Sequence, residues 1–293
     1  MKKFDFHTHT TYSHGDDSPE KMIATAQKEG IATLGISEHL PRLTNFRYSG
    51  ENGKIRGLST WGEYLMKMRK LRDDSRNQQT KVLLGCEVDW VGETHVSYYQ
   101  EQLREGEFDY TIGSVHFIGE IGFDYEADWE KLVEKFGKDN IIGVYEAYFA
   151  EYVKMVESGL FDIAGHLDLI KIFRDKNPLP AGVDILKLAD KALIALKKAG
   201  MVMEINTAGF AKGLGEFYPS EDILRKACEM GIPITFGSDA HSVKRVGDKF
   251  EEAMDLAKKV GYTEITVFRE GGKRESVKIG FQCLQESFPK SVK

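Results

Sequence analysis

Apolar residues fall into short runs that alternate with segments of helical character along most of the chain. The strand-like runs cover residues 4–9, 32–37, 81–89, 108–116, 161–166, 201–206 and 233–238. The helical segments cover residues 18–30, 60–76, 94–107, 129–158, 184–199, 220–230 and 248–260. A regular alternation of strands and helices is typical of a parallel α/β barrel, so this fold class is predicted.

Local signals support several of these boundaries. Ser18 and Pro19 suit the N-cap and the first position of a helix, and Gly30 and Gly200 each follow a helical segment. With 293 residues the chain can bury a large core, and we expect one barrel domain over residues 1–293.

Two segments depart from the alternating pattern. Residues 40–60 are polar without an apolar period, and so long a loop in a compact domain is typically functional or disordered. Because this loop follows a strand, we expect a lid and substrate clamp over the active end of the barrel, with a mobile solvated insert as the alternative. A short apolar segment at 264–267 precedes a charged tail from about residue 271, to which no role is assigned.

Composition limits which partners and which cell compartment are expected. Its 40 basic and 46 acidic residues give a formal net charge of −6, and without a long basic run no general nucleic-acid binding is expected. No apolar run approaches the roughly 20 residues of a membrane span, and the first residues lack the apolar part of a signal peptide. Three scattered cysteines suit a reducing cytoplasm. The oligomeric state stays open, a homodimer included.

The first candidate chemistry is the pair His7 and His9 at the end of the first predicted strand. Alternate strand residues point to the same face, so the two imidazoles project together, which suits a divalent metal. Such a pair also occurs by chance on surfaces. Similar signals at later strand ends favour the metal site.

Histidines recur where the predicted strands end. Seven of the eight lie at a strand's carboxyl end or in the loop that follows: His7, His9, His14, His39, His116, His166 and His241. Each alone could be a satisfied polar residue, but functional groups of parallel barrels collect at this end. Two carboxylates join them, because Glu87 lies inside an apolar strand, where an unpaired charge is costly, and Asp239 ends the seventh strand.

One zinc or manganese ion takes about four to six ligands, fewer than the seven histidines and two carboxylates found here. Two or three ions are therefore predicted, with Glu87 able to bridge. Neighbouring ions can clamp the attacking and leaving oxygens of an in-line displacement and convert bound water to hydroxide, which is the chemistry of phosphoester hydrolysis. The sequence contains no serine-nucleophile elbow, P-loop or dinucleotide fingerprint.

These residues lie in motifs that together resemble the PHP (polymerase and histidinol phosphatase) superfamily, over residues 3 to about 277. The motifs are DFHTHT, SEH, GCEVDW, IGSVHF, GHLDLIK, EINTAG and FGSDAH. The stretches GSVHF, GHLDLIK and the segment from EINTAG to FGSDAH are most similar to the histidinol-phosphate phosphatases of that superfamily, which act in histidine biosynthesis.

The resemblance implies a distorted (β/α)7 barrel with a trinuclear centre of zinc, manganese or iron, metals among which these ligand types do not select. It assigns His7, His9, Glu87 and Asp239 to one ion, Glu87, His116 and His166 to a second, and His14, His39 and His241 to a third. Asp239 and His241 are also expected to take part in catalysis.

The implied activity is hydrolysis of L-histidinol phosphate, a small phosphate ester, by attack of a metal-bound hydroxide. Arg42 and Arg174 are expected to bind and neutralise the phosphate, because a planar guanidinium matches phosphate bidentately. Lys171 and Asn206 are further substrate-binding candidates, and Glu204 is a possible acceptor for the substrate's ammonium. The basic residues could equally be surface charges, and Asn206 could cap its strand.

Two other interpretations stay open. A PHP phosphatase could act on another substrate, such as phosphotyrosine protein or a nucleotide, although a protein substrate would want an open site. From a different class, the chain could be a non-catalytic metal-binding module, like the PHP domains attached to polymerases. Loss of one or more ligands would support the module, whereas the ligand set here is complete.

Overall fold

The computed structural model of the protein describes residues 2–43, 46–49 and 58–279. Residues 44–45 and 50–57 of the expected lid, and residues 280–293 of the expected tail, lie outside the described residues. No described helix combines the length and apolar character that crossing a membrane requires.

Seven parallel strands form the centre of the molecule, and they pair in the order in which they occur along the chain. They are β1 (Lys3–Asp5), β2 (Ile31–Ile36), β3 (Lys81–Asp89), β4 (Tyr110–Ser114), β7 (Ile163–Ala164), β8 (Val202–Asn206) and β9 (Ile234–Gly237). The first and last strands also meet, because Phe6 N donates to Phe236 O at 3.1 Å and Thr8 forms a parallel bridge with Ala240. The predicted (β/α)7 barrel is therefore confirmed, and it is nearly closed.

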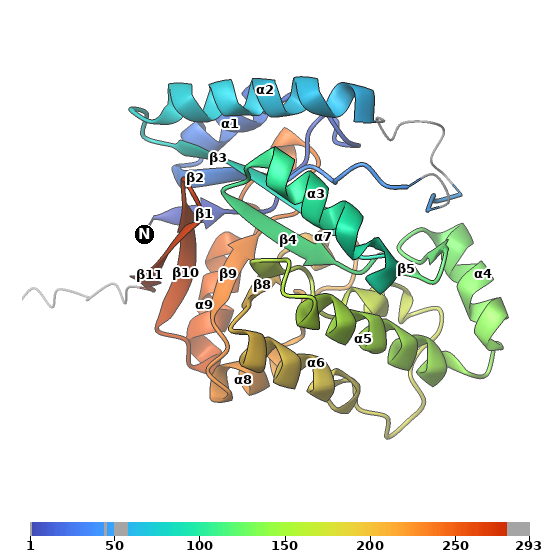
Figure 1. Ribbon diagram of the computed structural model, residues 1–293. Helices are drawn as coiled ribbons and strands as arrows, with labels where there is room; N and C mark the ends of the chain where they lie inside the picture. The colour runs from blue at the N-terminus through green and yellow to red at the C-terminus, as the bar shows by residue number, and fades with distance from the viewer. Residues whose placement is uncertain (1, 44–45, 50–57, 280–293) are drawn as a thin grey trace, which may run out of the picture.

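Helices cover the outside of the strands (Figure 1). The longer ones are α1 (Pro19–Lys28), α2 (Leu58–Ser75), α3 (Val96–Gly106), α4 (Glu126–Phe136), α5 (Ile141–Glu157), α6 (Ile185–Ala199), α8 (Glu221–Glu229) and α9 (Phe250–Val260). Short helical turns are η1 (Glu93–His95), η2 (Leu169–Phe173), α7 (Ala208–Ala211) and η3 (Val243–Arg245).

One expected helix, over residues 129–158, is in fact two. Gly137 ends α4 with a φ of 91°, a conformation that favours glycine, and the Asn140 side chain caps α5 by accepting from Gly143 N at 3.2 Å. The glycine at 137 and the cap at Asn140 thus interrupt a segment whose apolar pattern is helical on both sides. A small hairpin, β5 (Phe117–Ile118) and β6 (Ile121–Gly122), lies between β4 and α4.

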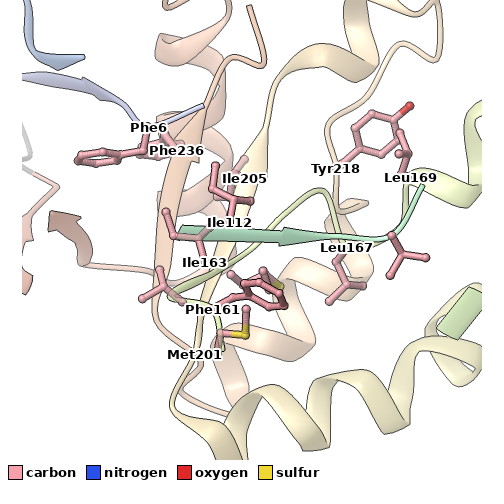
Figure 2. Close-up of a cluster of buried hydrophobic side chains, with 14 of the residues drawn as sticks. Phe6, Ile112, Phe161, Ile163, Leu167, Leu169, Met201, Ile205, Tyr218 and Phe236 are labelled. Carbon is pink, nitrogen blue, oxygen red and sulfur yellow. The ribbon is translucent and has the colours of Figure 1, made fainter. Parts of the chain in front are cut away.

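Apolar side chains fill the strand layer on both of its faces. Figure 2 shows Phe6, Ile112, Ile163, Ile205 and Phe236 as members of one buried cluster, and Phe236 also packs on Phe250 of α9, with ring centroids 5.9 Å apart. Each of these side chains is at most 3% exposed. This packing holds the strands in fixed register and leaves polar side chains to collect only at the ends.

The amino end of the barrel is covered by the antiparallel hairpin β10 (Glu264–Arg269) and β11 (Lys273–Lys278), beside the start of β1 (Figure 1). Phe268 packs on the rings of Phe6 and Tyr110, with centroids 5.5 and 5.4 Å apart. Gly271 N donates to Asp109 Oδ1 at 2.8 Å. Within the charged tail expected from residue 271, Lys273–Lys278 form strand β11, whose exposed side chains give no alternating hydrophobic pattern.

Candidate metal centre

The predicted ligands meet at the carboxyl end of the barrel, around Glu87. Its carboxylate is 1% exposed, and Oε2 lies 3.2 Å from the Nε2 atoms of His7, His9 and His39. Glu87 is in β3, whereas two of these histidines follow β1 and the third follows β2. Parallel neighbours that end at one level thus bring three imidazoles onto a single oxygen.

The other oxygen of Glu87 faces the next strands. Oε1 lies 3.2 Å from His166 Nε2 and 3.7 Å from His116 Nε2. On the opposite side, Asp239 Oδ1 lies 3.5 Å from His9 Nε2 and 3.8 Å from His7 Nε2. The two carboxylates therefore share imidazoles, as the sequence predicts for adjacent ions.

His14 and His241 complete the cluster at its more open side. Their Nε2 atoms lie 2.5 Å apart, and His241 Nδ1 is 2.9 Å from the backbone oxygen of Asp239. Burial lowers the pKa of His241 to about 3, and burial together with the neighbouring imidazoles lowers the pKa of His14 further. Both rings are thus in the neutral form that binds metals.

Two carboxylates that sequence reasoning did not assign to the centre orient its histidines. Glu204 Oε1 lies 2.7 Å from His7 Nδ1, and Asp89 Oδ1 lies 2.5 Å from His116 Nδ1. Partners of this kind fix the ring orientation and the tautomer of a metal-binding imidazole. A third carboxylate, Glu38, does not bond its nearest imidazole: Oε2 is 3.9 Å from His9 Nδ1, and Oε1 accepts from Thr10 N at 2.6 Å. Glu204 was considered a possible acceptor for the substrate's ammonium, but its carboxylate is hydrogen-bonded to His7.

Charges in the cluster hold its carboxylates ionised. Burial alone would raise the pKa of Glu87, but the imidazoles of His39 and His7 outweigh it and bring the pKa well below the usual range. The pKa of Asp239 is also well below its usual range, because His7 and His9 outweigh the effect of burial. Ionised carboxylates beside imidazoles form a donor set that suits zinc, manganese or iron.

Unsatisfied polar atoms show that the cluster fits divalent ions. His7 Nε2, both ring nitrogens of His9 and His166 Nδ1 are buried and have no hydrogen-bond partner among the described residues. Leaving such atoms bare costs about 1–3 kcal/mol each, which a bound cation would repay. Glu87 can serve two neighbouring ions, because it belongs to two groups of residues that could each hold one.

The ligand atoms of each possible group lie within 4.8 Å of one another. The groups are His7–His9–Asp239, His7–Glu87–His166, His9–His39–Glu87 and His39–Asp89–His116. The last includes Asp89, which the resemblance did not assign, and its Oδ1 faces the Nδ1 atoms of His39 and His116 at 3.3 and 2.5 Å.

Arg42 is the substrate-binding candidate that borders the centre. Its side chain is 8% exposed, and Nε lies 3.3 Å from Asp89 Oδ2. The guanidinium stacks over Tyr48 and Phe117, 4.9 and 5.1 Å from the ring centroids. A small cavity is lined by His39 and Arg42 together.

The other substrate-binding candidates are bound to protein groups. Lys171 Nζ lies 2.8 Å from Asp168 and donates to Phe217 O at 2.9 Å. Arg174 pairs with Glu216 and donates to Leu214 O at 3.0 Å. These contacts join η2 to the loop before α8.

The Asn206 amide is also used within the protein. Its Nδ2 donates to Glu204 Oε2 at 3.1 Å, and its Oδ1 accepts from Ala208 N at 2.9 Å. This placement agrees with the alternative of a strand cap and adds a role in holding Glu204.

Comparison with known proteins agrees with the geometry. A family model described as PHP domain matches residues 5–208. A protein named probable histidinol-phosphatase from Deinococcus radiodurans is 32% identical over 263 residues, covering 89% of this chain and 95% of its own. The histidinol-phosphatase of Bacillus subtilis is 28% identical over 269 residues, with 87% and 99% covered.

Solved structures share the fold. HisK from Listeria monocytogenes superposes with a TM-score of 0.73 at 25% identity, covering 85% of this chain and 99% of that one. Histidinol phosphate phosphatase from Lactococcus lactis, crystallised with zinc, L-histidinol and phosphate, gives a TM-score of 0.69 at 24% identity, with 94% and 99% covered.

Proposed function

The chain belongs to the PHP domain family, and we propose that it is a metal-dependent phosphomonoesterase that hydrolyses L-histidinol phosphate to L-histidinol and phosphate. The observation that carries the proposal is the convergence of five imidazoles on the two oxygens of one buried carboxylate, Glu87. An arrangement with so many unsatisfied nitrogen atoms fits neighbouring divalent ions better than a structural network. Its substrate follows from the relatives, which are named for this activity.

The protein's own residues divide the work. His7, His9, His14, His39, Glu87, Asp89, His116, His166, Asp239 and His241 would hold two or three zinc, manganese or iron ions. Such ions supply Lewis-acid chemistry and activate water at neutral pH. Glu204 keeps the Nε2 atom of His7 directed at the centre, and it is already buried and hydrogen-bonded, so little reorganisation is needed.

Phosphate binding falls first to Arg42. Its aromatic stack and its pairing with Asp89 hold the guanidinium at the edge of the centre, where it can neutralise phosphoryl oxygens. Arg174 is 39% exposed and can exchange Glu216 for a phosphate oxygen. Lys171 is 3% exposed and acts by keeping the loop before α8 in place.

We also propose a cytoplasmic setting, with a small-molecule substrate and neither nucleic acid nor membrane as partner. Cys86 and Cys228 are both free, as a reducing compartment would keep them.

The experiment is steady-state phosphate release from L-histidinol phosphate and from a panel of phosphomonoesters, including phosphotyrosine peptides and nucleotides, by protein that was stripped of metal and reloaded. We expect kcat/KM for histidinol phosphate to exceed that for every other ester. Equal, slow hydrolysis of all esters would refute the substrate but keep the phosphatase. No hydrolysis by fully metal-loaded protein would refute the enzyme and favour a metal-binding module.

A further inference from the structure

Tyr218 carries a hydroxyl group that the folded chain does not use. The residue is 0% exposed, and its OH has no hydrogen-bond partner among the described residues. In Figure 2 the ring lies beside Leu169, beyond the arrowhead of β4, and its oxygen points away from the apolar cluster. A buried phenol without a partner is costly, so the position requires an explanation.

The backbone places Tyr218 at the carboxyl end of the barrel. Tyr218 and Asn206 exchange two hydrogen bonds of 2.7 and 3.0 Å at the end of β8. Asn206 is paired with Gly237 of β9, two residues before Asp239. The tyrosine is therefore attached to the same end of the strands that delivers the metal ligands.

The groups around Tyr218 keep its hydroxyl protonated. Burial raises the pKa of Tyr218 well above its usual value, and the carboxylates of Asp168, Asp239 and Asp124 raise it further. Asp124 also acts on His116, so one carboxylate is within electrostatic reach of both the tyrosine and a predicted ligand. Lys171 Nζ lies 5.2 Å from the ring centroid and fixes the ring from one face.

Other buried tyrosines of the barrel are used differently. Tyr148 OH donates to Leu167 O at 3.0 Å, Tyr152 OH to Gly165 O at 2.7 Å, and Tyr110 OH to Phe6 O at 2.6 Å. Each of these hydroxyls holds a backbone segment. The histidines at this end are occupied as predicted ligands, whereas the buried phenol of Tyr218 has no hydrogen-bond partner among the described residues.

We propose that Tyr218 is a catalytic residue whose hydroxyl gives its proton to the departing oxygen of the phosphate ester. This assignment rests on the proposed function, phosphomonoester hydrolysis. As the P–O ester bond breaks, its electron pair goes to the alkoxide oxygen, which takes the phenolic proton. Water then returns a proton to the phenolate. The transferred proton neutralises the strongly basic alkoxide as it leaves, which is the task of a general acid.

The test is Tyr218→Phe, measured with an alkyl ester and with p-nitrophenyl phosphate, whose leaving group departs without a proton. For L-histidinol phosphate we expect kcat/KM to fall by about 10²-fold or more, the usual contribution of a positioned proton donor. For p-nitrophenyl phosphate we expect little change. Bound metal and Tm should stay at wild-type values, since the lost hydroxyl makes no hydrogen bond to a described protein group.

Tyr262→Phe is the matched control. Tyr262 lies just after α9, and its hydroxyl donates to Ile232 O at 3.0 Å. This control should lower Tm slightly and leave the ratio of the two activities unchanged. The contrast separates loss of a proton donor from loss of a phenol in general.

Two outcomes would overturn the inference: unchanged hydrolysis of alkyl esters by Tyr218→Phe, or an equal loss on both esters, which would make the hydroxyl a phosphate contact. The wild-type panel tests the proposed function separately. If histidinol phosphate is not a substrate, the same ratio is measured with any alkyl phosphate that is hydrolysed. If no ester is hydrolysed, both proposals fail.

Discussion

The two ends of the barrel both bury charged groups, but they treat them in opposite ways. At the amino end, Asp109 is 1% exposed and fully satisfied: its oxygens accept from Leu84 N at 2.9 Å and Gly271 N at 2.8 Å, and Arg72 lies 3.3 Å away. At the carboxyl end, His7 Nε2 and both nitrogens of His9 are equally buried and have no hydrogen-bond partner among the described residues.

This difference separates structure from function. Satisfied buried groups at the amino end fasten the β10–β11 hairpin to the strands, and their loss should affect folding. Unsatisfied groups at the carboxyl end cost stability in the folded chain and become favourable only with a ligand, so their loss should affect chemistry. Variants at the two ends should therefore change different measured quantities.

The largest effect is expected from Glu87→Gln. Removing the carboxylate that five imidazoles share should lower metal content and reduce kcat/KM by about 10³-fold or more, since metal ions supply several kcal/mol of transition-state stabilisation. Metal analysis and steady-state kinetics measure both quantities. Glu93→Gln, an exposed change in η1, is the control. A Glu87→Gln enzyme with full activity would break the comparison.

At the other end, Asp109→Ala should cost about 3 kcal/mol of unfolding free energy, because it leaves Arg72 and two backbone donors without their acceptor. Urea denaturation measures the loss, with Asp190→Ala, an exposed change in α6, as control. The folded fraction should keep wild-type kcat/KM and metal content. A drop in kcat/KM without a loss of stability would mean that Asp109 serves function rather than folding, against this account.

Glu204→Gln sharpens the comparison inside the carboxyl end. The carboxylate serves His7 Nδ1 and the backbone N–H of His166 with separate oxygens, whereas an amide offers a single acceptor. Metal affinity or activity should fall by about 10–100-fold, as for other partners of metal-binding histidines. Competition with a chelator measures the affinity. Wild-type affinity in the variant would remove Glu204 from the centre.

The smallest effect is expected from Arg76→Ala at the amino end. Its ion pair with Glu270 is half exposed, with side chains 52% and 40% accessible. Exposed pairs contribute about 0–1 kcal/mol, and less at high salt. Denaturation at low and high ionic strength should show a small loss that salt removes, with activity unchanged. A loss as large as that of Asp109→Ala would mean that the hairpin depends on surface charge.

The sequence predicted the barrel because strand and helix patterns alternate, and it brought the ligands together because His7, His39, His116 and His166 each follow a strand. It missed the supporting carboxylates. Glu204 stands in an apolar strand just as Glu87 does, but sequence spacing cannot say which imidazole each one faces.

The β10–β11 hairpin was missed for another reason. Lys273–Lys278 has almost every side chain exposed, so no alternation marks it as a strand. Its pairing with β10 and the contact of Gly271 N with Asp109 place it, and both depend on residues far apart in the chain. Likewise, nothing in the sequence distinguishes the Tyr218 hydroxyl, without a partner, from the hydroxyls of Tyr148 and Tyr152, which have one.

The most direct test of the account is a metal titration of stripped protein, following bound ions per chain and phosphate release from L-histidinol phosphate in the same samples. We predict that release begins only as two or three zinc, manganese or iron ions bind, and that Glu87→Gln neither takes up the full set nor releases phosphate. A metal-free protein that works at full rate, or a fully loaded one that hydrolyses no ester, would contradict the assignment of the carboxyl end to catalysis.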